Sequence, residues 1–231
     1  MIRRCLVVDT ETTGLDPAND SVIEIGALLY SVENRTILSE FATLIPGDEN
    51  AAEKINRIPA VALVEMASLD ELVTPLKGIF RSLRSTADVI VCHNVEFDQQ
   101  WFPAELRELP WVCTAFDFDW PMASREAGSL IHLALEHGIG VSSAHRALSD
   151  CHLIAALFDR MPLYGRDLQA MFARALRPKA IFQGLQRFEE NDVAKKAGFK
   201  WNGETKKWTR RMAIEDATLL PFKTVKLEEV A

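Results

Sequence analysis

Short runs of apolar, β-branched residues recur along the first part of the chain and predict strands. Residues 5–8 are uninterrupted by polar side chains, as expected of a central strand that is buried on both faces. Similar runs follow at residues 21–30 and 36–45, and Pro46-Gly47 ends the last of them. The connections between these strands are short, so we expect them to form an antiparallel meander.

Residues 51–161 predict helices that alternate with two further strands, at residues 89–92 and 111–113. Helical spacing is evident at residues 69–83, 129–137 and 146–161, and residues 51–66 predict short helical pieces interrupted at Pro59. A helix is also expected from Phe97, bent or broken at Pro103. A meander followed by strand–helix alternation predicts an α/β fold built on a mixed sheet.

The sign of the charge changes along the chain. The net charge is −7, but residues 174–231 hold 13 Lys/Arg against 8 Asp/Glu, whereas residues 1–173 hold 13 against 25. Residues 164–178 show neither a strand nor a helix pattern, so we predict domains at 1–165 and 175–231. The acidic domain is suited to binding cations and the basic one to binding a polyanion.

The composition indicates a cytoplasmic protein. No apolar run reaches the roughly 20 residues of a membrane span, and the N-terminal run ends at Asp9, too early for a signal peptide. The four cysteines lie far apart and form no C-x-x-C pair. We therefore expect buried free thiols in a reducing compartment rather than a disulfide or a zinc site.

Three carboxylates lie where predicted strands end. Side chains alternate along a strand, so Asp9 and Glu11 point to one side of the sheet, and two carboxylates in one space favour a bridging cation. Asp98 follows the strand at 89–92. Each also has a structural explanation: a polar turn after the strand for Asp9 and Glu11, and a helix N-terminus for Asp98.

Asp150 is the most informative carboxylate, because it shares the apolar face of the helix at 146–161 with Ala147 and Ile154. A lone buried carboxylate there would cost several kcal/mol, which a metal ion would offset. His145 falls at the start of the same helix and can act as a general base near neutral pH. Four hard oxygen donors favour Mg²⁺ or Mn²⁺, and a pair of such ions suits phosphodiester hydrolysis.

The set Asp9-x-Glu11, Asp98 and His145-x4-Asp150 resembles the DEDDh group of 3′–5′ exonucleases over about residues 1–162. The match includes Ile23-Glu24-Ile25-Gly26 and His93-Asn94-x-x-Phe97-Asp98. The histidine five residues before the last aspartate is typical of this subclass. Length and the pattern around Asp150-Cys151 make the chain most similar to exonuclease X-like members.

The resemblance implies a ribonuclease H-like fold and 5′-mononucleotides released from a 3′ end. It assigns two Mg²⁺ ions, replaceable by Mn²⁺, to Asp9, Glu11, Asp98 and Asp150, and makes His145 the base that deprotonates the attacking water. Its remaining substrate-binding candidates are Thr12, Thr13, Gly14, Leu15 (an apolar wedge), Ile58, His93, Asn94 and Phe97. His93, Asn94 and Phe97 could instead support the strand–helix turn. Asn56-Arg57-Ile58 stands where many relatives carry His-x-Ile, and Ile58 could stack on a base.

The basic C-terminal segment predicts a small α+β module. Its elements are strands at 179–188 and 222–227, a helix at 191–197 and a hairpin around residues 202–205 with Trp201 opposite Trp208. Aromatic and basic side chains interleave, which suits single-stranded nucleic acid. The candidates are Lys200, Trp201, Lys206, Lys207, Trp208, Arg210 and Arg211. The tryptophans could equally form the core of so small a module.

The leading functional prediction is a 3′–5′ exonuclease that acts on DNA, as single strands or 3′ tails. RNA trimming and polymerase-associated proofreading are the alternatives within this class. A binding module with a vestigial site and a zinc hydrolase are alternatives from other classes; the latter would use His132, His137, His145 and His152 and leave the carboxylates unexplained.

Overall fold

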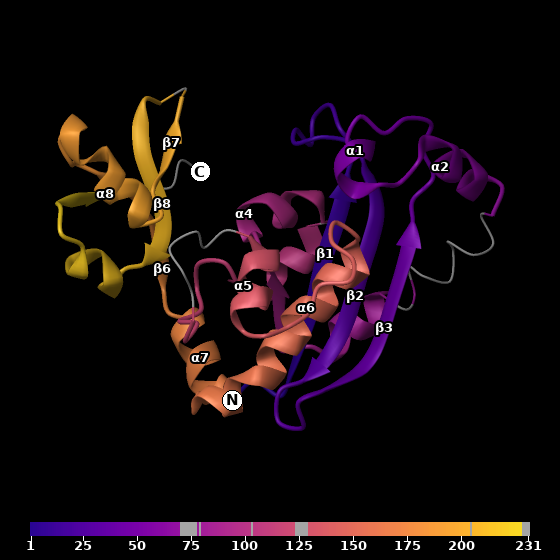
Figure 1. Ribbon diagram of the computed structural model, residues 1–231, viewed down its shortest axis with the longest axis horizontal. Helices are drawn as coiled ribbons and strands as arrows, with labels where there is room; N and C mark the ends of the chain where they lie inside the picture. Colours follow the sequence, from indigo (N-terminus) through magenta and orange to yellow (C-terminus); the bar gives the residue numbers. More distant parts are fainter. Residues whose placement is uncertain (70–77, 79, 103, 123–128, 204, 228–231) are drawn as a thin grey trace. The chain divides into compact units, whose positions relative to one another are not determined.

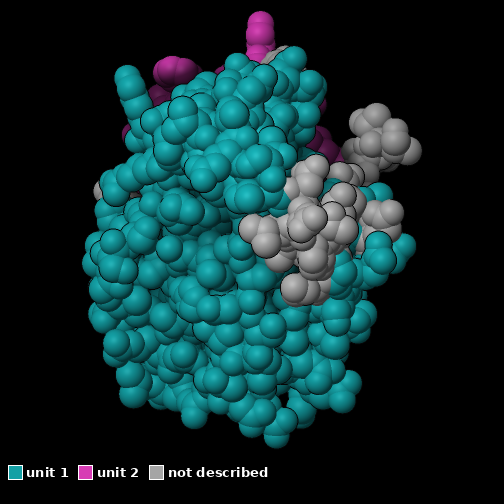
Figure 2. Space-filling view, turned by 90° about the vertical axis from the view of Figure 1, so that its right-hand side faces the viewer, with its two compact units in different colours: residues 1–175 teal, residues 176–231 magenta. Residues whose placement is uncertain are grey.

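The computed structural model describes residues 1–69, 78, 80–102, 104–122, 129–203 and 205–227. The chain forms two compact units, residues 1–175 (unit 1) and residues 176–231 (unit 2), which Figure 2 distinguishes by colour. Each unit has its own sheet and its own core, and each is described by itself. In the described part of the chain, no helix combines the length and apolarity needed to cross a membrane.

Unit 1 is built on a five-stranded mixed sheet with the order β3-β2-β1-β4-β5 (Figure 1). The antiparallel part consists of β1 (Arg4–Thr12), β2 (Val22–Ser31) and β3 (Thr36–Leu44). The strands β4 (Val89–Cys92) and β5 (Trp111–Cys113) continue it in parallel with β1. The predicted mixed sheet is confirmed, but β1 is longer than its apolar run, because pairing with β2 continues through Asp9 and Glu11.

Helices pack around this sheet. Helix α6 (Ala147–Arg160) lies across β1 and β2, and α5 (Leu130–Glu136) lies beside α6 (Figure 1). As predicted, α6 buries one apolar face, and Phe158 near its end packs against Tyr30 and Phe118. The shorter helices are α1 (Glu53–Asn56), α2 (Ala60–Ala67), α4 (Val95–Asp98) and the 3₁₀ turns η1 (Gln99–Trp101), η2 (Ala104–Glu108) and η3 (Met161–Tyr164).

One segment differs from its prediction. Residues 164–178 show no regular pattern at first reading, yet α7 (Leu168–Ala175) occupies most of them. Its buried residues recur at intervals of three and four, and Phe172 packs edge-on against Phe118 with ring centroids 5.3 Å apart. That spacing is present in the sequence, and α7 therefore completes the core of unit 1.

Other predictions are confirmed or shifted slightly. Pro59 separates α1 from α2, and Ser129 caps α5, which ends before Gly138. The helix expected from Phe97 begins at Val95, and Pro103 lies outside the described residues. Of the helix predicted over 69–83, residues 70–77 and 79 also lie outside them. All four cysteines are buried free thiols, as predicted.

Unit 2 is a four-stranded antiparallel sheet with the order β7-β8-β6-β9. Its strands are β6 (Lys179–Gly184), β7 (Lys200–Asn202), β8 (Lys207–Ala213) and β9 (Thr224–Lys226), joined by η4 (Phe188–Glu190), α8 (Asn191–Lys196) and η5 (Glu215–Leu219). Phe182, Ala194, Phe199 and Met212 form the centre of its core. The predicted hairpin is confirmed, with Trp201 paired to Trp208.

Strand register separates the basic candidates of unit 2. Trp208 and Met212 face the core, so Arg211 and Lys200, the latter paired with Thr209, lie on the opposite face of the sheet. Arg210 shares the face of Trp208, and its guanidinium donates a hydrogen bond to the Ala197 carbonyl at the end of α8. This hydrogen bond ties β8 to α8, and the binding of phosphate by Arg210 stays a prediction.

Candidate active site

The first turn of α6 rests directly on β2 because Gly26 has no side chain. A Cβ atom at Gly26 would lie 2.4 Å from the backbone nitrogen of Leu148 and 2.5 Å from the carbonyl carbon of Ala147. Gly26 is also the strand partner of Asp9 in β1. This close approach brings Asp150, in the first turn of α6, to the carboxylates of β1.

Glu24, which lies in β2, anchors the start of α6 to the sheet. Its buried carboxylate accepts hydrogen bonds from Arg146 Nη2 at 2.6 Å, from Arg146 Nε at 3.0 Å and from the backbone N–H of Ala147 at 2.9 Å. The residue before α6 provides no side-chain cap, so Glu24 satisfies an otherwise unpaired helix donor. The hydrogen bonds with Glu24 raise the pKa of Arg146 above its usual value.

The sequence reasoning missed Glu24 as part of the site. Its signal was available, because Glu24 is the one charged residue in the otherwise apolar strand β2. A charge on a buried strand needs a partner, and Arg146 lies 122 positions away, so no local pattern could name it.

His145 directly precedes Arg146 and has an unusual backbone conformation. Its φ of 58° is left-handed, which costs a non-glycine residue about 1–2 kcal/mol. The Glu24–Arg146 ion pair directly follows and holds the chain in this path. The His145 side chain is exposed to solvent, and it lies close enough to Asp150 to oppose in part the rise in the pKa of Asp150 that burial causes.

Three carboxylates converge beside the first turn of α6. One oxygen from each of Asp9, Glu11 and Asp150 lies within 4.8 Å of the other two. Oδ1 of Asp150 is buried and makes no hydrogen bond within the described residues. Three hard oxygens, one of them buried without a donor, fit a divalent cation such as Mg²⁺.

Burial and mutual repulsion make these carboxyl groups reluctant to ionise. Burial is the main cause for each of them. It raises the pKa of Asp9 well above its usual value, with Asp98 and Asp150 adding to the effect. The pKa of Glu11 rises to about 8, aided by the charges of Asp150 and Glu24. The pKa of Asp150 rises to about 6.

Asp98, the last residue of α4, acts electrostatically on Asp9, although it lies outside the set of three. It is 3 % exposed, and its Oδ2 accepts a hydrogen bond from the backbone N–H of Asn94 at 3.2 Å. Burial raises its pKa to about 7, and the charge of Asp150 contributes to this rise. The structure thus brings Asp9, Glu11 and Asp150 together, and the charge of Asp98 adds to the raised pKa of Asp9.

Comparison with known proteins identifies the family. A model of the exonuclease family (RNase T) matches residues 6–158. The DNA polymerase III subunit epsilon of Treponema pallidum (strain Nichols) is 34 % identical over 165 residues, which cover 66 % of this chain and 74 % of that protein. The chain belongs to the DEDDh family of 3′–5′ exonucleases.

Solved structures and larger relatives extend this result. Exonuclease X, solved with 5′-overhanging duplex DNA, superposes with a TM-score of 0.51 at 26 % identity, covering 74 % of this exonuclease and 99 % of that chain. E. coli exonuclease I with single-stranded DNA shares the fold (TM-score 0.55, 18 % identity, 80 % and 48 % covered). The PolC-type DNA polymerase III of Thermotoga maritima is 28 % identical over 170 residues, and the exonuclease covers 12 % of it. Residues 180–227 match a domain of unknown function.

The turn after β1 is internally braced in this exonuclease. The Thr12 hydroxyl donates to the Gly14 carbonyl at 2.6 Å, and the Thr13 hydroxyl donates to Asp20 at 3.2 Å. Both threonines are buried, whereas Leu15 is 81 % exposed. Of the predicted substrate contacts here, Leu15 is the side chain that remains open, and the two threonines fix the shape of the turn.

The predicted contacts in the second motif are also anchored. His93 Nδ1 lies 2.9 Å from the Thr114 hydroxyl, which joins the ends of β4 and β5. Asn94 donates its backbone N–H to Asp98, and the Phe97 ring packs 5.7 Å from the Trp101 ring. These contacts favour the alternative in which His93, Asn94 and Phe97 support the strand–helix turn that precedes Asp98.

Ile58 lies in the interior rather than on the surface. It is 2 % exposed and packs with Ile23 and Leu63. Asn56, also buried, donates to the Thr12 carbonyl at 3.3 Å and accepts from the backbone N–H of Ile58. The prediction that Ile58 stacks on a base is wrong for this conformation, since the segment Asn56–Ile58 instead supports the turn after β1.

The alternative histidine site is not formed. His137 is buried against the Trp120 and Tyr164 rings, and His152 pairs with Glu40 of β3 at 2.9 Å. Among the described residues, the candidate metal-binding group contains carboxylates and no histidine. The zinc-hydrolase interpretation therefore has no support in the geometry.

The raised carboxyl pKa values predict how stability changes with pH. A carboxyl group whose pKa is higher in the folded than in the unfolded state stabilises the fold when the pH is below its unfolded-state pKa. This stabilisation is lost as the pH rises through its folded-state pKa. Without metal, the melting temperature should fall by several degrees between about pH 5 and about pH 8, the range spanned by Asp150, Asp98 and Glu11. Differential scanning fluorimetry in EDTA measures this.

The same measurement with Mg²⁺ provides the comparison. Because protons compete with the cation, Mg²⁺ should raise the melting temperature more at the higher pH. Equal stabilisation by Mg²⁺ at both pH values would mean that the cation binds outside this carboxylate group.

Proposed function

We propose that this enzyme degrades DNA from the 3′ end, on single strands or 3′ tails, and releases 5′-mononucleotides. The observation that carries the proposal is the convergence of Asp9, Glu11 and Asp150, with Oδ1 of Asp150 buried and without a donor among the described residues. We further propose that these three residues and Asp98 hold two Mg²⁺ ions, for which Mn²⁺ can substitute. Bound cations of this kind activate water and stabilise charge on the phosphoryl group.

The side chains around the carboxylates have separate proposed roles. His145 accepts the proton of the attacking water, a role supported by its exposure and by its position beside Asp150. Glu24 and Arg146 position His145 by fixing the backbone that follows it. Leu15, projecting from the braced turn, packs against the terminal base.

DNA is the proposed substrate because of the relatives. Their names describe the epsilon subunit of DNA polymerase III and a PolC-type DNA polymerase III, and exonuclease X was solved with DNA. The similarity to the epsilon subunit also supports a second candidate, proofreading in association with a polymerase. RNA trimming is the remaining alternative, and only contacts to the 2′-hydroxyl would distinguish it.

The proposal is tested with matched DNA and RNA oligonucleotides, single-stranded and double-stranded, each labelled at the 5′ end. We expect a ladder that shortens from the 3′ end in Mg²⁺, faster on DNA than on RNA, and no cleavage in EDTA. Chromatography should identify 5′-mononucleotides. Faster cleavage of RNA would reject DNA as the preferred substrate, and cleavage of covalently closed circles would reject an exonuclease.

A further inference from the structure

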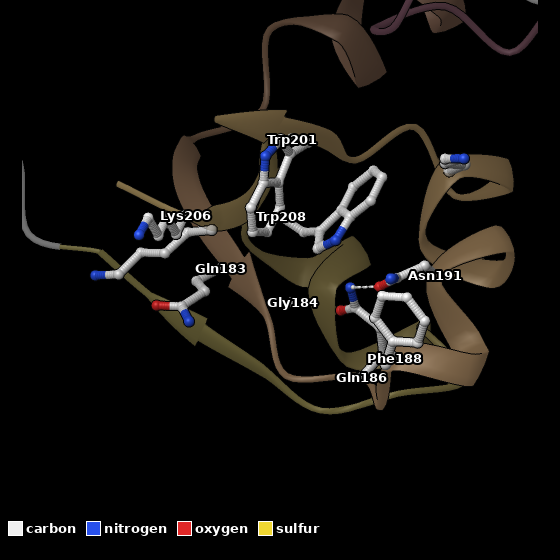
Figure 3. A pocket seen from close by; sticks show the side chains of 10 residues that line it. Gln183, Gly184, Gln186, Phe188, Asn191, Trp201, Lys206 and Trp208 are labelled. Carbon is white, nitrogen blue, oxygen red and sulfur yellow. Dashed lines mark hydrogen bonds between the residues drawn. The ribbon is translucent and has the colours of Figure 1, made fainter. Parts of the chain in front are cut away.

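Unit 2 contains a pocket of about 600 Å³ that the carboxylate chemistry does not use (Figure 3). The indoles of Trp201 and Trp208 lie next to each other with ring centroids 5.7 Å apart. Gln186, Phe188 and Asn191 line another side of the pocket. The pocket thus combines flat aromatic surfaces with side-chain amides.

The two most exposed aromatic rings of the pocket lie outside the core of unit 2. Phe188 is 85 % exposed and Trp201 is 52 % exposed, and neither belongs to the core cluster of unit 2. Trp208 differs, because it packs against that core from the edge. Exposed aromatic side chains beside a hollow are typical of a binding surface, whereas Trp208 serves both the core and the pocket.

An amide oxygen in the pocket lacks a donor. Gln186 donates through Nε2 to Asn191 Oδ1 at 3.2 Å, while its Oε1 is buried and accepts no hydrogen bond within the described residues. Gly184 leaves room for this group, since a Cβ there would lie 2.4 Å from Gln186 Oε1. A buried acceptor of this kind loses free energy unless a ligand donates to it.

The charges around the pocket indicate an anionic ligand. Lys195 and Lys206 line it, and Lys195 also lies over the Trp208 ring at 5.9 Å. Aromatic faces, a hydrogen-bond acceptor and cations together match the base, the base-edge N–H and the phosphate of a nucleotide. Every nucleobase has an N–H group on its pairing edge, so the acceptor does not select one base.

We infer that this pocket binds an unpaired nucleotide of a single strand, as a second binding site separate from the carboxylates. The base stacks on Trp201 and Phe188, its edge donates to Gln186, and Lys206 contacts the phosphate. The inference rests on the proposed function only in taking the ligand to be nucleic acid. It assigns nucleic-acid binding to one pocket rather than to the whole basic surface of unit 2. Lys200 and Arg211 are excluded from this binding site because they lie on the other face of the sheet.

The test measures binding of the full chain to a fluorescein-labelled oligothymidine of about 12 nucleotides by anisotropy, in EDTA so that no cleavage occurs. Trp201→Ala should weaken binding about tenfold or more, while Trp201→Phe, which keeps an aromatic face, should restore most of it. Lys206→Ala should weaken binding and reduce its salt dependence. Lys196→Ala is the matched control, because this exposed lysine of α8 does not line the pocket.

The inference is overturned if Trp201→Ala binds like the wild type, or if Lys196→Ala weakens binding as much as Lys206→Ala. Failure of the inference and failure of the proposed function are distinguishable. If the chain shortens DNA but Trp201→Ala leaves both affinity and KM unchanged, only the pocket assignment fails. If no DNA is cleaved but the Trp201 and Lys206 variants lose binding, the pocket assignment stands and the proposed activity fails.

Discussion

Replacing Asp9 with asparagine is expected to abolish exonuclease activity while making the metal-free protein more stable. Asp9 lies within 4.8 Å of oxygens from Glu11 and Asp150, and its pKa is raised by burial and by its charged neighbours. The amide has nearly the same shape but carries no charge, so it relieves the repulsion and removes an anionic ligand. We expect the cleavage rate to fall roughly 10³-fold or more and the melting temperature in EDTA to rise.

Opposite changes in activity and stability distinguish a ligand from a structural residue. Asp48→Asn is the matched control, because it removes the same charge from an exposed position and should change neither quantity. In the Asp9→Asn protein, Mg²⁺ should no longer raise the melting temperature appreciably. Activity near that of the wild type would contradict the metal-site assignment.

Gly26→Ala is expected to cause the largest loss of stability. The added methyl group would lie 2.4–2.5 Å from backbone atoms of Ala147 and Leu148. These atoms cannot move aside easily, because the Ala147 N–H is bound to the buried carboxylate of Glu24. We expect the free energy of unfolding to fall by about 3 kcal/mol, measured in urea. Activity should fall as well, since displacement of α6 moves Asp150 away from Asp9.

A second glycine provides the control for this substitution. A methyl group added at Gly140 would meet no atom of the described residues within 4 Å, and the φ of Gly140 is not positive. Gly140→Ala should therefore leave stability unchanged or raise it slightly, through the lower entropy of the unfolded chain. If Gly26→Ala were equally harmless, the close packing of α6 on β2 would not be what places Asp150.

The sequence was most informative where local pattern and burial coincide. The strands of unit 1, the apolar face of α6 and the Trp201–Trp208 pair followed from spacing alone. The carboxylates Asp9, Glu11 and Asp150 were predicted to converge because each lies next to buried residues, and the structure brings them together.

The sequence was less informative about residues whose partners lie far away along the chain. Glu24 acts through Arg146, and Asn56 acts through the Thr12 carbonyl; neither pairing leaves a local signal. The resemblance to the family predicts that Ile58 contacts a base, and the basic character of the C-terminal segment predicts that Arg210 contacts phosphate. In the fold, Ile58 packs against Ile23 and Leu63, and Arg210 donates a hydrogen bond to the Ala197 carbonyl.

The positions of the carboxylates along the chain have a consequence during synthesis. Asp9 and Glu11 precede Asp150 by about 140 residues, and Asp150 reaches them only when α6 docks on Gly26 and Glu24. A nascent or partly unfolded chain therefore holds only a fragment of the ligand set.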